Sequence, residues 1–99
     1  MKNNKFDTSY ESFALEYDRA TGEFGDYTNR HTLYPMFLKV IEDPGKSKIY
    51  DIGCSNGAFD RWLVMNGARY IFASDVSQTL IYIAETKYPT KHIKYSNRD

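Results

Sequence analysis

Residues 48–77 read KIYDIGCSNGAFDRWLVMNGARYIFASDVS. An apolar, strand-like run at 48–52 is followed by a glycine turn at 53–57 and by a helical pattern at 58–66. A second apolar run lies at 70–73. A strand, a tight turn, a helix and another strand are the parts of a parallel βαβ unit, in which the helix carries the chain from one strand to the next. Residues 48–77 therefore predict an α/β fold.

The same alternation continues toward the carboxyl end. A helical pattern follows Asp75 and ends at Tyr88-Pro89, and the run 92–95 predicts a third strand. Strand, helix, strand, helix, strand is one half of a doubly wound, Rossmann-like parallel sheet. The right-handed crossover rule makes the three strands parallel neighbours in the order 3-2-1. We expect the strand at 70–73 to be buried on both faces, because it is apolar throughout.

Two helices are predicted before the sheet. The first lies at about residues 9–20, where four residues recur at helical spacing: Tyr10, Phe13, Ala14 and Tyr17. The second carries four apolar residues on one face: Leu33, Phe37, Val40 and Ile41. Pro35 either begins this second helix or kinks it. Apolar stripes usually pack, so we expect both helices to cover a core.

The length and the charge balance limit the class of protein. Ninety-nine residues suffice for one small domain, which we divide into amino-terminal helices at 1–45 and an incomplete βαβαβ half at 46–99. Thirteen Lys and Arg balance thirteen Asp and Glu, so the basic excess typical of nucleic-acid binders is missing and no nucleic-acid partner is expected. The sequence has neither a signal-peptide core nor an apolar run of about 20 residues, so we expect no membrane partner and a cytoplasmic location.

Cysteine and histidine give no sign of a disulfide or a metal site. Cys54 is the single cysteine, and we interpret it as a packing residue because no histidine accompanies it as a base. His31 and His92 have no acidic or cysteine partners at ligand spacing. We therefore predict no metal.

A ligand site is predicted at the glycine turn. Ligands of open α/β sheets bind beyond the carboxyl ends of the strands, where the turn 53–57 and Asp75 lie. Glycine lets the backbone approach a ligand without a Cβ, and the helix that follows directs free N–H groups at the site. Asp75 follows Gly53 by 22 residues, and a carboxylate there can accept two hydrogen bonds from the hydroxyls of a ribose. We predict an adenosine-containing ligand.

The spacing of the turn separates classes of nucleotide site. A dinucleotide fingerprint G-x-G-x-x-G beginning at Gly53 needs a glycine where the chain has Ser55. A phosphate-binding P-loop needs a Gly-Lys-Ser/Thr ending, which the turn lacks. The pattern that is present is Asp-x-Gly-x-Ser-x-Gly, at Asp51, Gly53, Ser55 and Gly57.

This pattern resembles the first motif of the class I S-adenosylmethionine-dependent methyltransferases, of the type that acts on small molecules. That motif is typically Asp/Glu-x-Gly-x-Gly-x-Gly, often with cysteine in the fourth place, as Cys54 is here. Ser55 replaces the middle glycine with another small residue. The resemblance extends from about residue 10 to the end of the chain and covers the amino-terminal half of the family's domain.

Residues outside the turn complete the resemblance. Asp75 is similar to the family's ribose-binding acid, and Val76 to the residue that flanks the adenine. Tyr17 is similar to a tyrosine of the preceding helix that approaches the cofactor, and Asp99 to an acid that accepts from the adenine amino group. The resemblance thus implies that S-adenosylmethionine is bound by nine residues: Tyr17, Asp51, Gly53, Cys54, Ser55, Gly57, Asp75, Val76 and Asp99.

The resemblance implies a methyltransferase with a small-molecule acceptor. The family's full sheet has about seven strands, and the part that borders the acceptor follows the three strands predicted here. We therefore assign no catalytic residue and expect the isolated chain to be inactive. The strand at 48–52, which is central in the family, would have an open edge, and we expect a partner chain or a missing carboxyl-terminal half to cover it.

Two other functions stay open. The nucleotide-binding half of an NAD(P)-dependent oxidoreductase would share the fold and Asp75, and a non-catalytic truncated fragment or interaction module would keep the fold without the activity. Single residues also have structural alternatives. Asp51 can shape the turn, Asp75 can cap the helix that follows it, and Tyr17 can pack in the core.

Overall fold

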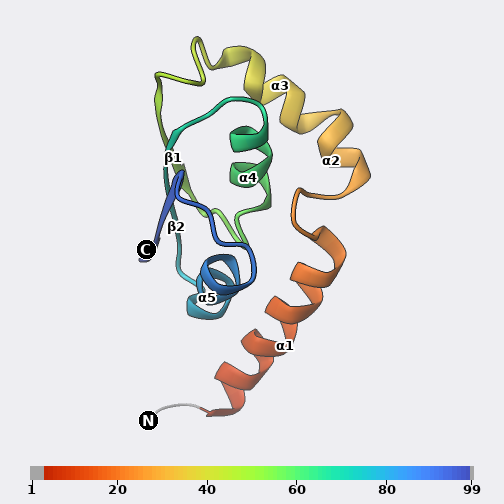
Figure 1. Cartoon of the computed structure of the whole chain (residues 1–99). Helices are drawn as coiled ribbons and strands as arrows, with labels where there is room; N and C mark the ends of the chain where they lie inside the picture. Colours follow the sequence, from red (N-terminus) through yellow and green to blue (C-terminus); the bar gives the residue numbers. More distant parts are fainter. Residues whose placement is uncertain (1–3, 99) are drawn as a thin grey trace.

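Three parallel strands form one sheet in the computed structural model, which describes residues 4–98 (Figure 1). β1 (Lys48–Ile52) pairs with β2 (Tyr70–Asp75), and β2 pairs with β3 (Ile93–Asn97). The order is β1-β2-β3, so β2 is central and has the same neighbours as in the predicted order 3-2-1. β2 continues beyond the predicted end at 73, which places Asp75 at the last position of the strand. The chain thus has the expected partial, Rossmann-like α/β architecture.

The two helices that connect the strands lie on the same side of the sheet (Figure 1). α4 (Ala58–Met65) ends before Gly67, whose φ of 106° requires a residue without a Cβ. α5 (Gln78–Lys87) begins at Ser77, whose Oγ accepts a hydrogen bond of 3.1 Å from the Leu80 backbone N–H. Both crossovers run in the same direction along the sheet, and right-handed crossovers of that kind place their helices on one face.

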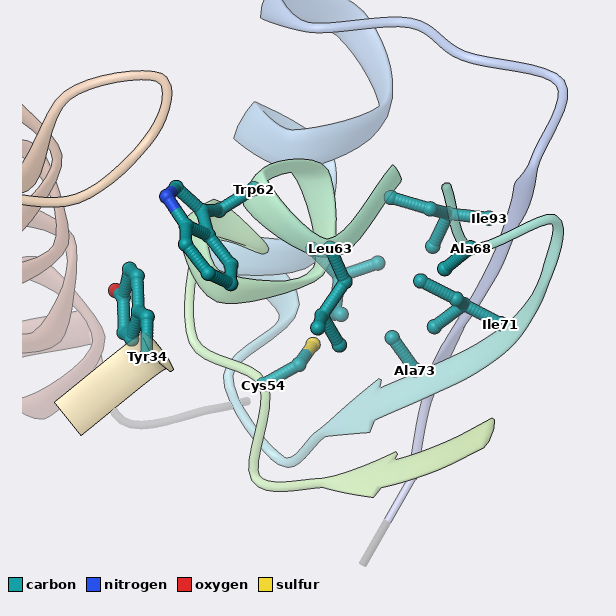
Figure 2. Close-up of a cluster of buried hydrophobic side chains, with 9 residues drawn as sticks. Tyr34, Cys54, Trp62, Leu63, Ala68, Ile71, Ala73 and Ile93 are labelled. Atoms are coloured by element: carbon teal, nitrogen blue, oxygen red, sulfur yellow. The ribbon is translucent and has the colours of Figure 1, made fainter. Parts of the chain in front are cut away.

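A hydrophobic core fills the space between these helices and the sheet (Figure 2). Leu63 of α4 and Ile71 of β2 have almost no exposed surface, at 0% and 1%. Figure 2 shows Leu63 between Cys54 on one side and the strand residues Ile71 and Ala73 on the other. The buried members of the cluster come from three helices, two strands and two connecting loops: Tyr34, Cys54, Trp62, Leu63, Ala68, Ile71, Ala73, Ile81 and Ile93.

The opposite face of the sheet is bare in the described part of the chain. Tyr50 and Phe72 stack on each other there at 5.1 Å between ring centroids, and Ile52 is 81% exposed. The prediction that β2 is buried on both faces is therefore wrong for this chain. Ile71 and Ala73 are buried, whereas Tyr70 and Phe72, which point to the other face, are exposed. An apolar run shows that a strand is suited to burial on both faces, but the covering layer must come from elsewhere.

Three helices precede the sheet, one more than predicted. α1 (Asn4–Thr21) begins earlier than the predicted start at residue 9. α2 (Tyr27–His31) was not predicted; Asp26 caps it, because its side chain accepts a hydrogen bond of 2.8 Å from the Asn29 backbone N–H. α3 (Leu33–Val40) starts two residues before Pro35, so the proline lies in the first turn. Backbone N–H groups in the first turn have no acceptor within the helix, so the missing N–H of Pro35 costs no helical hydrogen bond.

The predicted apolar stripe of the second helix covers the core only in part, because Ile41 packs against the core cluster. Leu33, Phe37 and Val40 are exposed, and the buried residue of this helix is Tyr34. The Tyr34 ring packs against the rings of Phe59 and Trp62 at centroid distances of 4.8 and 5.6 Å. α3 therefore packs on the rest of the chain through several side chains, because the Phe37 ring also lies 5.6 Å from the Phe59 ring and Leu38 packs against the core cluster. Within residues 4–98, no helix is long and apolar enough to cross a membrane.

The bare sheet face and the open edge of β1 predict low stability. Much apolar surface stays in contact with water, so the isolated chain, shown to be monomeric by sedimentation, should melt below about 60 °C. Circular dichroism against temperature measures this. A cooperative transition well above that temperature would contradict the prediction.

Candidate functional site

The glycine turn is bound tightly to the end of β2. The backbone N–H groups of Gly53 and Cys54 both donate to the carbonyl oxygen of Ser74, at 2.7 and 2.8 Å. Along the turn the chain takes the left-handed conformation three times: φ is 89° at Gly53, 56° at Ser55 and 83° at Gly57. Ser55 is small, but its backbone conformation is one that favours glycine and costs about 1 kcal/mol for other residues. The turn is therefore strained at the position where the sequence departs from the glycine pattern.

The two glycines have different roles in the structure. A Cβ at Gly53 would meet no atom within 4 Å, so this glycine leaves open space beside the turn. A Cβ at Gly57 would instead collide with the hydroxyl of Tyr95, and it would lie 2.8 Å from the Nη1 atom of Arg61. Gly57 thus lets the turn pack against β3 and α4 and does not line the open side.

Asp75 holds the turn from the end of β2. Its Oδ2 accepts a hydrogen bond of 2.8 Å from the Ser55 N–H, and its Oδ1 accepts one of 2.9 Å from the Ser77 N–H. The cap of α5 is Ser77, so the alternative role of Asp75 as the helix cap is wrong. Each carboxylate oxygen keeps a further acceptor position, because an ionised carboxylate offers about four lone-pair sites. Val76, next to it, is exposed.

A buried polar network joins α1 to the turn. Asp18, which is 4% exposed, accepts hydrogen bonds from Asn56 Nδ2 at 2.8 Å, Lys87 Nζ at 2.6 Å and the Tyr88 hydroxyl at 3.0 Å. Burial alone would raise the pKa of Asp18, but the hydrogen bonds from these three groups outweigh it and hold the pKa below its ordinary value. The network fixes the end of α1 against the turn, and with it the neighbouring Tyr17.

Sequence analysis did not single out Asp18 or Asn56. Asn56 is 1% exposed, and its Oδ1 also accepts a hydrogen bond of 3.2 Å from the Ala58 N–H at the start of α4. The sequence did offer one sign of this role, a large polar residue in a turn of small residues. Such a residue needs a hydrogen-bond partner when it is buried. That partner lies 38 residues earlier in the chain, so local patterns could not identify it.

A pocket of about 240 Å³ opens between α1, α3 and the glycine turn. Its walls are formed by residues of these three segments together with β1, α2 and the start of α4: Tyr17, Asn29, Leu33, Tyr34, Phe37, Asp51, Gly53, Cys54, Ser55, Asn56, Ala58 and Phe59. Sites for whole drug-sized ligands commonly measure about 300–1,000 Å³, so this pocket would hold part of such a ligand.

The predicted cofactor residues fall into three groups in the structure. Five of them line this pocket: Tyr17, Asp51, Gly53, Cys54 and Ser55. Three lie outside its walls, namely Gly57, Asp75 and Val76, although Asp75 contacts the turn through Ser55. Asp99 lies outside the described residues. The structure therefore brings five of the nine together around one cavity and adds Asn56 to them.

Carboxyl groups dominate the electrostatics below the pocket. Asp60 has 0% exposure, and neither of its oxygens has a hydrogen-bond donor within residues 4–98. Its pKa lies well above the ordinary value, because of burial first and of the neighbouring Asp51 carboxylate second. Burial also raises the pKa of the Cys54 thiol, with Asp60, Asp51 and Asp75 adding to the effect. Cys54 is thus an uncharged packing residue, as its core position indicates.

The buried cation beside these acids is Arg61, which binds several other groups, although its Nη2 atom has no hydrogen-bond partner among the described residues. Arg61 donates from Nε to the carbonyl oxygen of Glu23 at 2.7 Å and from Nη1 to that of Asn56 at 2.6 Å. Its guanidinium also lies 4.0 Å from the centre of the Tyr88 ring. Within the described residues, no group of three or more His, Cys, Asp or Glu is arranged to hold a metal ion.

A solved structure has a fold similar to that of this chain. The chain is similar to phosphoethanolamine N-methyltransferase 1 of Haemonchus contortus, solved in complex with phosphoethanolamine and S-adenosylhomocysteine. The TM-score is 0.62 at 17% identity, and the match covers 100% of this chain and 22% of that protein. At this identity the likeness shows a methyltransferase-like fold. No protein-family model matches the chain, and no curated protein matches it.

The strain at Ser55 predicts the effect of restoring glycine. Ser55→Gly should raise the free energy of unfolding by about 0.5–1 kcal/mol. Glycine removes the strain of the left-handed conformation, and this gain exceeds the entropic cost of a more flexible unfolded chain. Urea titration measures the change. Gly57→Ala is the matched control and should lower the free energy by about 2 kcal/mol or more, since its methyl group collides with the Tyr95 hydroxyl. Equal stability of Ser55→Gly and the parent chain would show that the turn is not strained.

The buried Asp60 predicts a pH-dependent gain in stability on neutralisation. Unfolded Asp60 is ionised above about pH 4, whereas burial raises its folded pKa, so folding costs free energy as the pH rises above that value. Asp60→Asn should therefore be more stable than the parent chain at pH 7, and the gain should shrink as the pH falls toward 4.

The control for this measurement is Asp18→Asn. The folded pKa of Asp18 is lowered, so its ionised form stabilises the protein above about pH 4 and loses that effect as the pH falls. Asp18→Asn should thus be less stable than the parent chain at pH 7, the opposite sign. Denaturant titrations at both pH values would refute the account if the two variants shifted stability in the same direction.

Proposed function

We propose that this chain is the S-adenosylmethionine-binding portion of a methyltransferase that acts on a small-molecule acceptor. The observation that carries the proposal is the acidic pocket at the carboxyl ends of the strands. Asp51 lines this pocket, and the buried cation Arg61 donates from Nε and Nη1 to the carbonyl oxygens of Glu23 and Asn56. The methyltransferase-like fold supports the same reading.

The charges of the ligand agree with those of the site. S-adenosylmethionine has no phosphate, and its sulfonium and α-ammonium groups are positive. A positive group at the pocket would meet the Asp51 carboxylate, and an opposite charge at hydrogen-bond distance stabilises both ions. A nicotinamide dinucleotide would instead bring two negative phosphates toward Asp51 and Asp75, in a turn that offers no Lys or Arg of its own. The electrostatics thus favour the sulfonium cofactor over the dinucleotide.

The remaining contacts support a proposed position for each part of the cofactor. Asp75 would receive the ribose hydroxyls with the acceptor positions that Ser55 and Ser77 leave free, and the exposed Val76 would flank the adenine. Gly53, with no atom near its missing Cβ, would allow close approach of the ligand to the backbone. Tyr17 would close the methionine end from α1, where the Asp18 network holds it.

The chain's own contribution is binding and orientation. When bound, S-adenosylmethionine supplies an activated methyl group, and transfer in line with the acceptor depends mainly on positioning. No residue of the chain is proposed as a base. The acceptor would bind against the bare sheet face or the open edge of β1. A partner chain or a carboxyl-terminal half would cover these surfaces and complete the acceptor site. The similar protein spans far more than this match, which covers 22% of it.

Titration calorimetry tests the proposal. S-adenosylhomocysteine should bind the chain, whereas the nicotinamide dinucleotides should not. Asp75→Asn should weaken binding of S-adenosylhomocysteine by about tenfold, because it replaces a charged acceptor of the ribose hydroxyls by an amide. Glu85→Gln, at an exposed position of α5, is the control and should bind like the parent chain. Binding of a nicotinamide dinucleotide alone would favour an oxidoreductase half, and binding of neither would favour an interaction module.

A further inference from the structure

The bare face of the sheet carries a contiguous group of exposed apolar side chains. The strand register places Tyr50 beside Phe72 on this face, and Ile52 and Tyr70 lie on it as well. Tyr50 and Ile52 are 67% and 81% exposed. Single apolar residues at a surface are common, but a contiguous patch of this kind marks a surface that binds another molecule.

The charged side chains of the same face are all basic. Lys48 lies beside Tyr70 at the start of β1, Lys94 lies beside Phe72 on β3, and Arg98 follows β3 directly. Within residues 4–98, none of these three cations takes part in a salt bridge. The face therefore has an apolar centre and positive charges at both outer strands, and these charges have no acidic partner in the described chain.

A groove of about 620 Å³ crosses the carboxyl-terminal part of this face. Its lining includes the apolar residues Tyr50, Ile52 and Phe72 and the two cations Lys94 and Arg98, and it contains no Asp or Glu. A partner that fills this groove must supply an apolar ridge, and it gains from negative charge on the side of β3.

The dimensions of the sheet match those of one helix. Neighbouring strands lie about 4.8 Å apart, so the outer strands of a three-stranded sheet are separated by about 10 Å. A helix with its side chains is about 10–12 Å in diameter, and three helical turns have the length of a five-residue strand. Parallel sheets are normally covered by helices on both faces, whereas here α4 and α5 cover one.

The charges also decide between kinds of occupant. If two copies of the chain packed with these faces together, Lys94 and Arg98 of one copy would meet the same cations of the other, and like charges at an interface cost several kcal/mol. A flat anionic lipid surface would satisfy the cations but would leave the groove unfilled. An acidic, rod-shaped partner satisfies both the charge and the shape.

We infer that the bare sheet face is the docking surface for one amphipathic helix of a partner chain. The apolar stripe of this helix packs over Tyr50, Ile52 and Phe72, and acidic side chains along one flank pair with Lys94 and Arg98. The inference is independent of the proposed function, because none of these five residues lines the pocket at the glycine turn.

Fluorescence anisotropy with two labelled synthetic helices tests the inference on the full chain. Both peptides have the same leucine stripe, but one has glutamate and the other has lysine on the flanks. The glutamate peptide should bind at least about tenfold more tightly at low salt, because two attractive ion pairs replace two repulsive ones. The ratio of affinities should fall toward one as salt is added, since salt screens exposed charges.

Charge reversal on the protein should invert this preference. The double variant Lys94→Glu with Arg98→Glu should bind the lysine peptide more tightly than the glutamate peptide. Lys91→Glu, at an exposed position outside the groove, is the matched control and should keep the preference of the parent chain. Ile52→Ser should weaken binding of both peptides by about tenfold, because it removes an apolar contact. Thermal melts show whether each variant is folded.

Several outcomes would overturn the inference. The absence of binding of either peptide, equal affinity for the two peptides at low salt, or an unchanged preference in the double variant would exclude an acidic helix as the occupant. Binding of phosphatidylglycerol vesicles without binding of the glutamate peptide would assign the face to a membrane. A dimer in sedimentation velocity that Ile52→Ser dissociates would assign the face to a second copy of the chain.

Discussion

Three backbone N–H groups of the glycine turn donate to the end of β2, two to the Ser74 carbonyl and one to the Asp75 carboxylate. This attachment determines where everything else at the site lies. It directs the chain from β1 into α4 at a fixed angle, so that Leu63 enters the core and Asp60 comes to lie under the turn. It also joins the two strand ends that a ligand would span. A rigid turn on a sheet edge is what a precise binding site requires.

The network of Asp18 extends this arrangement to a third segment. Because Asn56 belongs to the turn and Lys87 and Tyr88 to the end of α5, one carboxylate connects α1 with both connections of the sheet. The walls of the pocket therefore come from segments that are far apart in the sequence. The buried Asp18 carboxylate, with donors from three side chains, holds these segments in fixed relative positions. The same hydrogen bonds stabilise the ionised carboxylate and so lower the pKa of Asp18.

The sequence was sufficient for the parts that depend on local patterns. The alternation of apolar runs with helical spacing predicted the βαβαβ unit. The bounds of β1 were predicted correctly, whereas β2 extends two residues beyond its predicted end. Features that depend on distant partners were missed. The periodicity of α3 showed an apolar face, but nothing in it revealed that Tyr34 makes the contact while Leu33 and Val40 stay exposed. The burial of Asp60 and Asn56 likewise follows from tertiary packing, which places a polar residue inside without marking it in the pattern.

The bonds of Asp18 have a consequence for the order in which the protein forms. Its partners Lys87 and Tyr88 are 69 and 70 residues away along the chain, so α1 gains its anchor when α5 is complete. Closing a loop of that length costs more entropy than the short closures within the sheet. During synthesis, the amino-terminal helix would leave the ribosome first and dock last. The Tyr17 wall of the pocket is then the final part to assemble, and the turn between β1 and α4 forms before the pocket is closed.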